Sequence, residues 1–133
     1  MCLFKRFKKV AGNKTLGQIT KEDRSVYNNQ CGVYKMKDKN TGETKYIGRA
    51  IEHNNGGFRK RLSDYTRPSG SARKHSSGKA IYENRDNLNV EFYSTGKGTK
   101  GAQKAARLEK KIIEKEKKRG SNLYNVQWNR DKE

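Results

Sequence analysis

Residues 31–50 read CGVYKMKDKNTGETKYIGRA, two aromatic and aliphatic segments separated by turn-forming residues. The segments at 31–37 and 44–49 are rich in aromatic and β-branched side chains, which favour strands. The residues between them, DKNTG at 38–42, favour a tight turn. We therefore expect an antiparallel hairpin at the centre of the structure.

Two tyrosines in this hairpin define a candidate site. With the turn centred near Asn40, Tyr34 lies opposite or nearly opposite Tyr46, and opposed side chains of an antiparallel pair project from the same face. Two phenols would then point at one spot. A slip of one residue in the register would place them on opposite faces, so the prediction depends on the turn.

The composition of the chain indicates a polyanionic partner. Of its 133 residues, 32 are Lys or Arg and 14 are Asp or Glu, and the net charge is +18. Only 30% of the residues are hydrophobic, which suits one domain with a modest core. A charge of this sign and size favours nucleic acid or an anionic membrane. Because the sequence has no long apolar run and no helix with a wide apolar face, we expect DNA and no membrane.

The cysteines and histidines provide neither a zinc site nor a disulfide framework. Cys2, Cys31, His53 and His75 lack the spacing that either would need. The opening residues, MCLF, are too short an apolar segment for a signal peptide. We therefore expect a reducing, cytoplasmic location, such as a bacterial or phage-infected cell.

Charge also divides the chain into two parts. Residues 1–24 hold seven Lys or Arg and two acidic residues, with few apolar positions. We expect this part to be a basic arm, partly mobile without its partner, because binding phosphates by counterion release needs no fixed shape. Residues 25–133 are expected to form the folded domain.

A short helix is predicted directly after the hairpin and a glycine-rich loop. Phe58, Leu62 and Tyr65 share one face of a helix over 58–65. At about 100° per residue, Arg61 lies within about 60° of Phe58 and Tyr65, whereas Arg59 points to solvent. An inward arginine must be paired or used, since burying its charge unpaired is costly.

The following segment is basic and is predicted to contact DNA. Residues 66–78 read as a flexible loop, residues 79–85 as a short helix and residues 89–94 as a third strand. The candidate DNA contacts on and beside this loop are Arg59, Arg67, Arg73, Lys74 and Lys79.

The last predicted helix carries a carboxylate on its apolar face. Over 102–118, the side chain of Glu109 falls within about 60° of Ala102, Ala105, Ile112 and Ile113, whereas Glu114 is turned about 140° away and should be exposed. A lone inward glutamate is either an ion-pair partner, with Arg61 as the candidate, or a ligand for a hard cation. The pattern of the residues leaves both open.

Together these residues resemble a known nuclease superfamily. Gly32-Val33-Tyr34 followed by Tyr46-Ile47-Gly48 is similar to the signature of the GIY-YIG nucleases, here as a stand-alone catalytic domain. By this resemblance Arg61 matches the family's arginine, and Tyr65 takes a position held by histidine or tyrosine. The loop at 51–57 departs from the pattern, being several residues longer than in compact members.

The resemblance extends to the last helix and the segment beyond it. Glu109 lands where the family's glutamate holds a metal. Asn125 matches the closing asparagine by its place after Leu-Tyr, with Asn122 as the alternative.

The resemblance implies an α/β (α+β) sandwich with a small, mainly antiparallel three-stranded sheet flanked by helices. It implies hydrolysis of DNA phosphodiester bonds with Mg²⁺, or Mn²⁺ in its place, bound by Glu109. Arg61 would stabilise charge on the phosphate. Tyr34 or Tyr46 would deprotonate or orient the attacking water, which for a base requires a pKa about three units below the phenol value of about 10. Lys45 and Arg49 are candidates to lower it.

Other functions remain open from the sequence. The chain could be a non-catalytic DNA-binding module that keeps the fold, a structure-specific or RNA-directed nuclease, or a basic structural protein whose tyrosines only pack. Homo-oligomerisation is also open, as is the choice among restriction, homing, repair and attack on host DNA. No residues that would read base edges can be identified.

Overall fold

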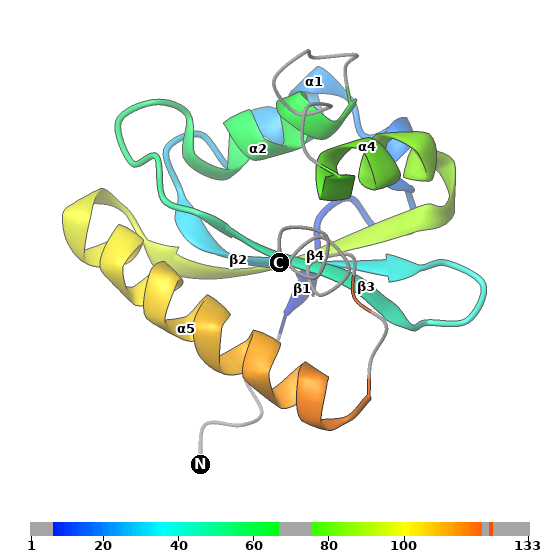
Figure 1. The fold of residues 1–133 in the computed structure, drawn as a ribbon. Coiled ribbons are helices and arrows are strands. Elements are labelled where there is room, and N and C mark those ends of the chain that lie inside the picture. Colours follow the sequence, from blue (N-terminus) through cyan, green and yellow to red (C-terminus); the bar gives the residue numbers. More distant parts are fainter. Residues whose placement is uncertain (1–6, 67–75, 121–122, 124–133) are drawn as a thin grey trace.

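The computed structural model describes residues 7–66, 76–120 and 123 and has an α+β architecture (Figure 1). An antiparallel sheet of four strands lies between helices. The elements are β1 (Lys8–Lys9), η2 (Leu16–Gln18), α1 (Lys21–Ser25), β2 (Cys31–Asp38), β3 (Thr44–Ala50), α2 (Gly57–Thr66), α4 (Ser76–Glu83), η3 (Arg85–Asn87), β4 (Leu88–Gly96) and α5 (Gly98–Lys118).

The sheet has the strand order β1-β4-β2-β3, and all three pairings are antiparallel. The predicted hairpin is the β2–β3 pair, and the predicted third strand is β4, which pairs with the other edge of β2. The expectation of three strands was incomplete, because β1 adds a fourth at the outer edge of β4, where Lys8 lies opposite Phe92.

The segment at 7–24 differs from the mobile arm expected for residues 1–24. Val10, Leu16 and Ile19 are all buried in the main core. The hydroxyl of Tyr27 also donates a hydrogen bond to the carbonyl oxygen of Val10 (3.2 Å). The segment is basic, but its few apolar side chains are spaced so that each reaches the core, and burial of each contributes roughly 1.5–3 kcal/mol.

The hairpin register places the two tyrosines on one face, as predicted. Tyr34 lies opposite Gly48, and Tyr46 lies opposite Met36, so the tyrosines are displaced by two residues and are not directly opposed. Their rings are 6.1 Å apart between centroids. The β2–β3 register passes over Lys45, which forms a bulge close to the turn. The bulge comes before Tyr46, so Tyr46 and Gly48 still project from the same face of β3.

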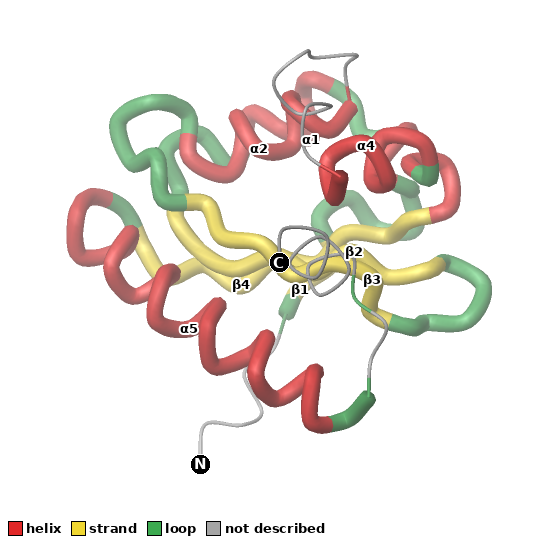
Figure 2. The backbone as a smooth tube through the Cα atoms, in the orientation of Figure 1, coloured by secondary structure: helices red, strands yellow, loops and turns green. Residues whose placement is uncertain are grey.

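Helices cover both faces of the sheet (Figures 1 and 2). Helices α1, α2 and α4 lie on one side, with α2 packing Phe58, Leu62 and Tyr65 into the main core, as predicted. Helix α5 lies on the other side, against a smaller cluster that contains Val33 and Ile47. Within the described part of the chain, no helix is both long and apolar enough to span a membrane.

Gly48 provides the space that the ring of Tyr34 occupies. A Cβ atom built on Gly48 would overlap the end of the Tyr34 ring and its hydroxyl oxygen. We expect Gly48→Ala to lower the free energy of unfolding by about 1–3 kcal/mol, because the ring must leave its position or the strands must separate. Chemical denaturation monitored by circular dichroism measures this change.

The same substitution in a Tyr34→Leu background is the control. Without the ring, the added methyl group of Gly48→Ala meets no phenol. The loss in free energy of unfolding caused by Gly48→Ala should then fall to below about 1 kcal/mol. Equal costs in both backgrounds would show that the overlap with Tyr34 does not constrain the hairpin.

Candidate active site

Three tyrosines form the centre of the candidate site. The hydroxyl oxygens of Tyr34 and Tyr65 are 3.1 Å apart and share a hydrogen bond. The ring of Tyr46 lies 6.2 Å from that of Tyr65, centroid to centroid, in an edge-on arrangement. Tyr34 and Tyr46 come from the hairpin and Tyr65 from α2, so the contact between these elements assembles the cluster.

Burial favours the neutral phenol of Tyr34 and of Tyr46. Tyr34 is almost fully buried and its ring stacks on Phe58 at 5.2 Å between centroids. Burial, followed by the neighbouring phenols of Tyr65 and Tyr46, raises the pKa of Tyr34 well above its ordinary value of 10. Burial, Tyr65 and the carboxylate of Glu109 likewise raise the pKa of Tyr46 well above 10. In this state neither hydroxyl serves as a base near neutral pH.

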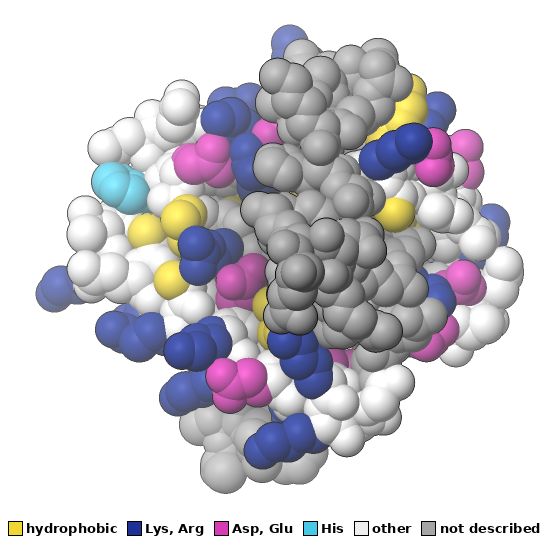
Figure 3. All heavy atoms as spheres, in the orientation of Figure 1, with side chains coloured by type: hydrophobic (Ala, Val, Ile, Leu, Met, Phe, Trp, Pro, Cys, Tyr) yellow, Lys and Arg dark blue, Asp and Glu magenta, His cyan; other side chains and the backbone are white. Residues whose placement is uncertain are grey.

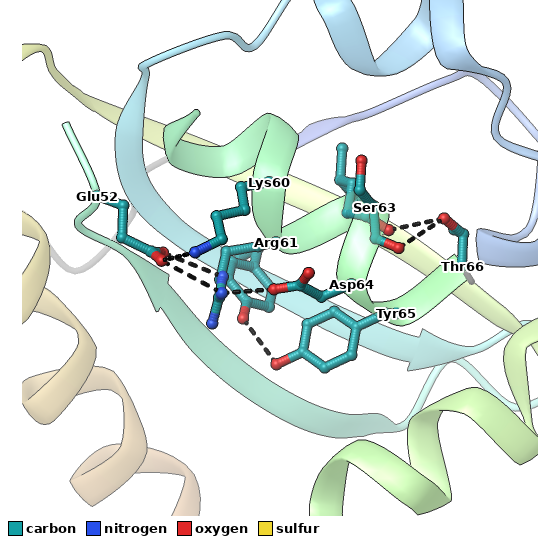
Figure 4. A network of polar contacts seen from close by, with 9 residues as sticks. Glu52, Lys60, Arg61, Ser63, Asp64, Tyr65 and Thr66 are labelled. Carbon is teal, nitrogen blue, oxygen red and sulfur yellow. Dashed lines mark hydrogen bonds and ion pairs between the residues drawn. The ribbon is translucent and has the colours of Figure 1, made fainter. Parts of the chain in front are cut away.

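Arg61 faces the tyrosines, as predicted, and two carboxylates hold it (Figure 4). Its Nη2 donates hydrogen bonds to Asp64 (2.5 Å) and to Glu52 (3.3 Å). Its buried Nε lies 3.2 Å from Glu52 but in a geometry that makes no hydrogen bond. The Arg61 side chain is 27% exposed, so a ligand can reach it.

Glu109 projects from α5 and is mostly buried, with 18% of its side chain exposed. It pairs with Arg49 of β3 at 3.7 Å, so its ion-pair partner is Arg49 and not the candidate Arg61. The reason is topological, because α5 and α2 lie on opposite faces of the sheet. Burial raises the pKa of Glu109 above its ordinary value of 4.5, and Arg49 only partly opposes this.

Tyr46 links the two halves of the site. Its hydroxyl group is close enough to Glu109 for the carboxylate to raise its pKa and close enough to Arg61 for the guanidinium to lower it. β3 is the edge strand of the described sheet, so the α2 side and the α5 side meet at its free edge. The structure therefore brings Arg61, Glu109 and the tyrosines to one edge, although helices on opposite faces carry them.

The carboxylate of Glu109 suits a cation that needs few protein ligands. Among the described residues, no three His, Cys, Asp or Glu side chains gather as a metal cage. Mg²⁺ keeps several waters and binds through one or two carboxylates plus substrate phosphates. A partly desolvated carboxylate with one long ion pair gains from a second cation. This donor set therefore fits Mg²⁺, or Mn²⁺, held by Glu109.

The secondary candidates have ordinary partners. Lys45 forms an ion pair with Glu43 at 2.9 Å, and Arg49 pairs with Glu109. Arg49 therefore lies beside the candidate metal ligand Glu109, and the side chain of Arg49 is 46% exposed.

The predicted DNA contacts are only partly described. Nε of Arg59 donates a hydrogen bond to Oδ1 of Asn28 (2.9 Å), and Lys79 on α4 is exposed. The remaining candidates lie outside the described residues, as do both asparagines proposed to close the site: Arg67, Arg73, Lys74, Asn122 and Asn125.

Two residues of the site were missed in the sequence. Asp64 stands three positions after Arg61, a spacing at which opposite charges on a helix interact, so this ion pair was predictable. Glu52 lies in the loop after β3 and also pairs with Lys60 at 2.9 Å. No periodic signal marks a loop residue, so Glu52 could be found only from the structure.

Glu109→Gln should test whether this carboxylate is structural. A raised pKa means that the folded state favours the protonated form, so stability is greatest below the unfolded pKa and is lost as pH rises through the folded pKa. The neutral amide of the Glu109→Gln variant does not ionise, so the variant should not lose this stability as the pH rises. Relative to Glu114→Gln, which makes the same charge change at an exposed site on α5, we expect Glu109→Gln to be equally or more stable at pH 8.

Thermal melts of both variants and the parent from pH 4 to pH 8 measure this difference. The ion pair with Arg49 is long and half exposed on the Arg49 side, so it contributes at most about 1 kcal/mol. A destabilisation of Glu109→Gln at pH 8 clearly larger than that, and absent in Glu114→Gln, would identify Glu109 as a structural ion-pair residue.

Comparison of the whole chain with known proteins finds no relative. No family model, no curated protein and no solved structure matches the chain. The features of the chain that bear on function are therefore the residues of the site, namely the tyrosine cluster, the half-buried Arg61 and the desolvated Glu109.

Proposed function

We propose that the protein is a metal-dependent DNA endonuclease that hydrolyses phosphodiester bonds at the free edge of β3, as the resemblance to GIY-YIG nucleases implies. The observation that carries this proposal is the arrangement at the outer edge of β3, where Arg61 lies beside the tyrosine cluster and Glu109 pairs with Arg49 of that strand. A cation, a carboxylate and polar hydroxyls at one accessible edge are the groups that phosphate hydrolysis requires.

Arg61 binds the scissile phosphate in this proposal. Its guanidinium is already oriented by Asp64 and Glu52, and the bond to Glu52 is the longer of the two. A phosphate oxygen replaces Glu52, and the planar donor fork then contacts two phosphate oxygens. Asp64, one turn along α2, keeps the side chain in place during this exchange.

The tyrosines orient the reacting groups. Because burial keeps Tyr46 protonated, its hydroxyl donates a hydrogen bond to a phosphate oxygen or positions the attacking water. This role differs from a tyrosine base, which would need a pKa shift in the opposite direction. Tyr34 is almost fully buried, so its role is to hold Tyr65 in place. The shared hydrogen bond with Tyr65 sets the direction of the Tyr34 hydroxyl.

Glu109 holds the divalent cation. When bound, Mg²⁺ supplies charge neutralisation at the phosphate and a more acidic bound water. The chain itself contributes the ionised carboxylate and its position at the edge of β3, with Arg49 beside it as a second contact for the DNA backbone. The net charge of +18 supplies the general attraction to DNA.

The first test is cleavage of supercoiled plasmid with Mg²⁺, with EDTA, and with Glu109→Gln. We expect nicking or linearisation by the parent protein, loss of activity in EDTA, and a decrease of at least about 100-fold in Glu109→Gln, since the carboxylate holds the cation. Gel analysis of the nicked fraction over time measures the rate.

The matched control is Glu114→Gln, because Glu114 is exposed on the same helix. It should cleave at the parent rate. Glu109→Gln should still bind DNA with an affinity near that of the parent. Tight DNA binding without cleavage by any of the three proteins would identify a non-catalytic DNA-binding module instead.

Arg61→Lys tests the role of the guanidinium. The substitution keeps the charge but removes the planar fork, so we expect cleavage to slow by about 10-fold or more. Arg24→Lys, on α1 and bound to the carbonyl oxygen of Ile19, should cleave within about twofold of the parent. Similar rates for Arg61→Lys and Arg24→Lys would exclude a specific contact between Arg61 and the phosphate.

A further inference from the structure

A groove of about 800 Å³ lies between α5 and the sheet, on the face opposite the tyrosine cluster. Its described lining contains six cationic side chains and one carboxylate, that of Glu116. The cations are Lys35, Lys104, Arg107, Lys111, Lys115 and Arg119. The proposed nuclease reaction uses none of them.

The cations of α5 form a row along one side of the groove. From Lys104 to Lys115 on α5, and on to Arg119 directly after the helix, they recur at every third or fourth residue, so they share one face and span about 22 Å. All five are exposed. Figure 3 shows Lys and Arg side chains gathered over the α5 side of the molecule. A row of this kind matches the repeated phosphates of a strand.

The floor of the groove is apolar and aromatic. Phe7 and Tyr93 line it with rings 5.8 Å apart, and Leu108 and Ile112 of α5 lie beside them. Nζ of Lys35 sits 4.5 Å from the centre of the Phe7 ring. Aromatic rings below a rim of cations are the arrangement that accepts stacked bases and tracks the phosphates of a single strand.

We propose that this groove binds a single strand of nucleic acid, with phosphates along the α5 cations and bases against Phe7 and Tyr93. A duplex presents phosphates and sugars outward and would leave the aromatic floor unfilled. A membrane would contact protruding apolar groups, whereas these side chains lie below the cations. This inference does not require the nuclease activity, because the groove and the tyrosine cluster lie on opposite faces of the sheet.

The test is fluorescence anisotropy in EDTA with labelled dT20, rU20 and a 20-base-pair duplex over a range of salt concentrations. EDTA prevents metal-dependent cleavage, so the result is separate from that of the nuclease assay. The groove variant is Arg107→Gln/Lys111→Gln. The control is Lys110→Gln/Lys117→Gln, which removes the same charge from exposed positions of α5 outside the groove.

We expect the groove variant to bind dT20 and rU20 about 10-fold or more weakly at low salt, and its salt slope to fall by about 1.4. The control should change single-strand affinity by less than about threefold, and duplex affinity should change similarly in both variants. If the two variants lost the same affinity for single strands, the proposal would be overturned in favour of general attraction by charge.

Tyr93 separates base stacking from charge. Tyr93→Leu should lower the affinity for dT20 by about fivefold or more and leave the affinity for inorganic polyphosphate unchanged. Tyr93→Phe keeps the ring, so it should bind dT20 like the parent. Circular dichroism confirms that each variant is folded. Equal losses of affinity for dT20 and polyphosphate would overturn the proposal. It would also be overturned if the groove variant lost affinity for phosphatidylserine vesicles or a polyglutamate peptide and kept its affinity for dT20.

Discussion

The contact between the Tyr34 ring and Gly48 is the constraint on which the candidate site depends. Tyr34 can lie flat across the neighbouring strand only because Gly48 has no side chain there. In that position its ring stacks on Phe58 of α2 and its hydroxyl reaches Tyr65. The same contact therefore joins the hairpin to α2, which in turn places Arg61 next to the tyrosines.

The edge position of β3 is the second requirement. Arg61 and Glu109 belong to helices on opposite faces, and a further strand beyond β3 would separate them. With β3 outermost in the described sheet, both charges act on Tyr46. The site is thus assembled at an edge of the described sheet rather than on a face.

Much of this arrangement could be predicted from sequence. The turn residues and alternation at 31–50 predicted the hairpin and the shared face of the tyrosines, and helical periodicity predicted the inward Arg61 and Glu109. Periodicity describes one element at a time, so it could not show that α5 and α2 lie on opposite faces, and it left open an ion pair between Arg61 and Glu109 that the structure does not contain. Glu52 and β1 were missed because a loop residue and a two-residue strand carry no period.

The charges of the site are poorly explained by stability alone. Glu109 is partly desolvated with one long ion pair, and the buried Nε of Arg61 makes no hydrogen bond. A partly buried carboxylate with one long ion pair costs free energy that an apolar side chain of similar size would avoid. In the proposed function, a divalent cation would supply a further partner to Glu109, and a phosphate would take the place of Glu52 at Arg61. The local cost at Glu109 would then follow from the binding of charged ligands.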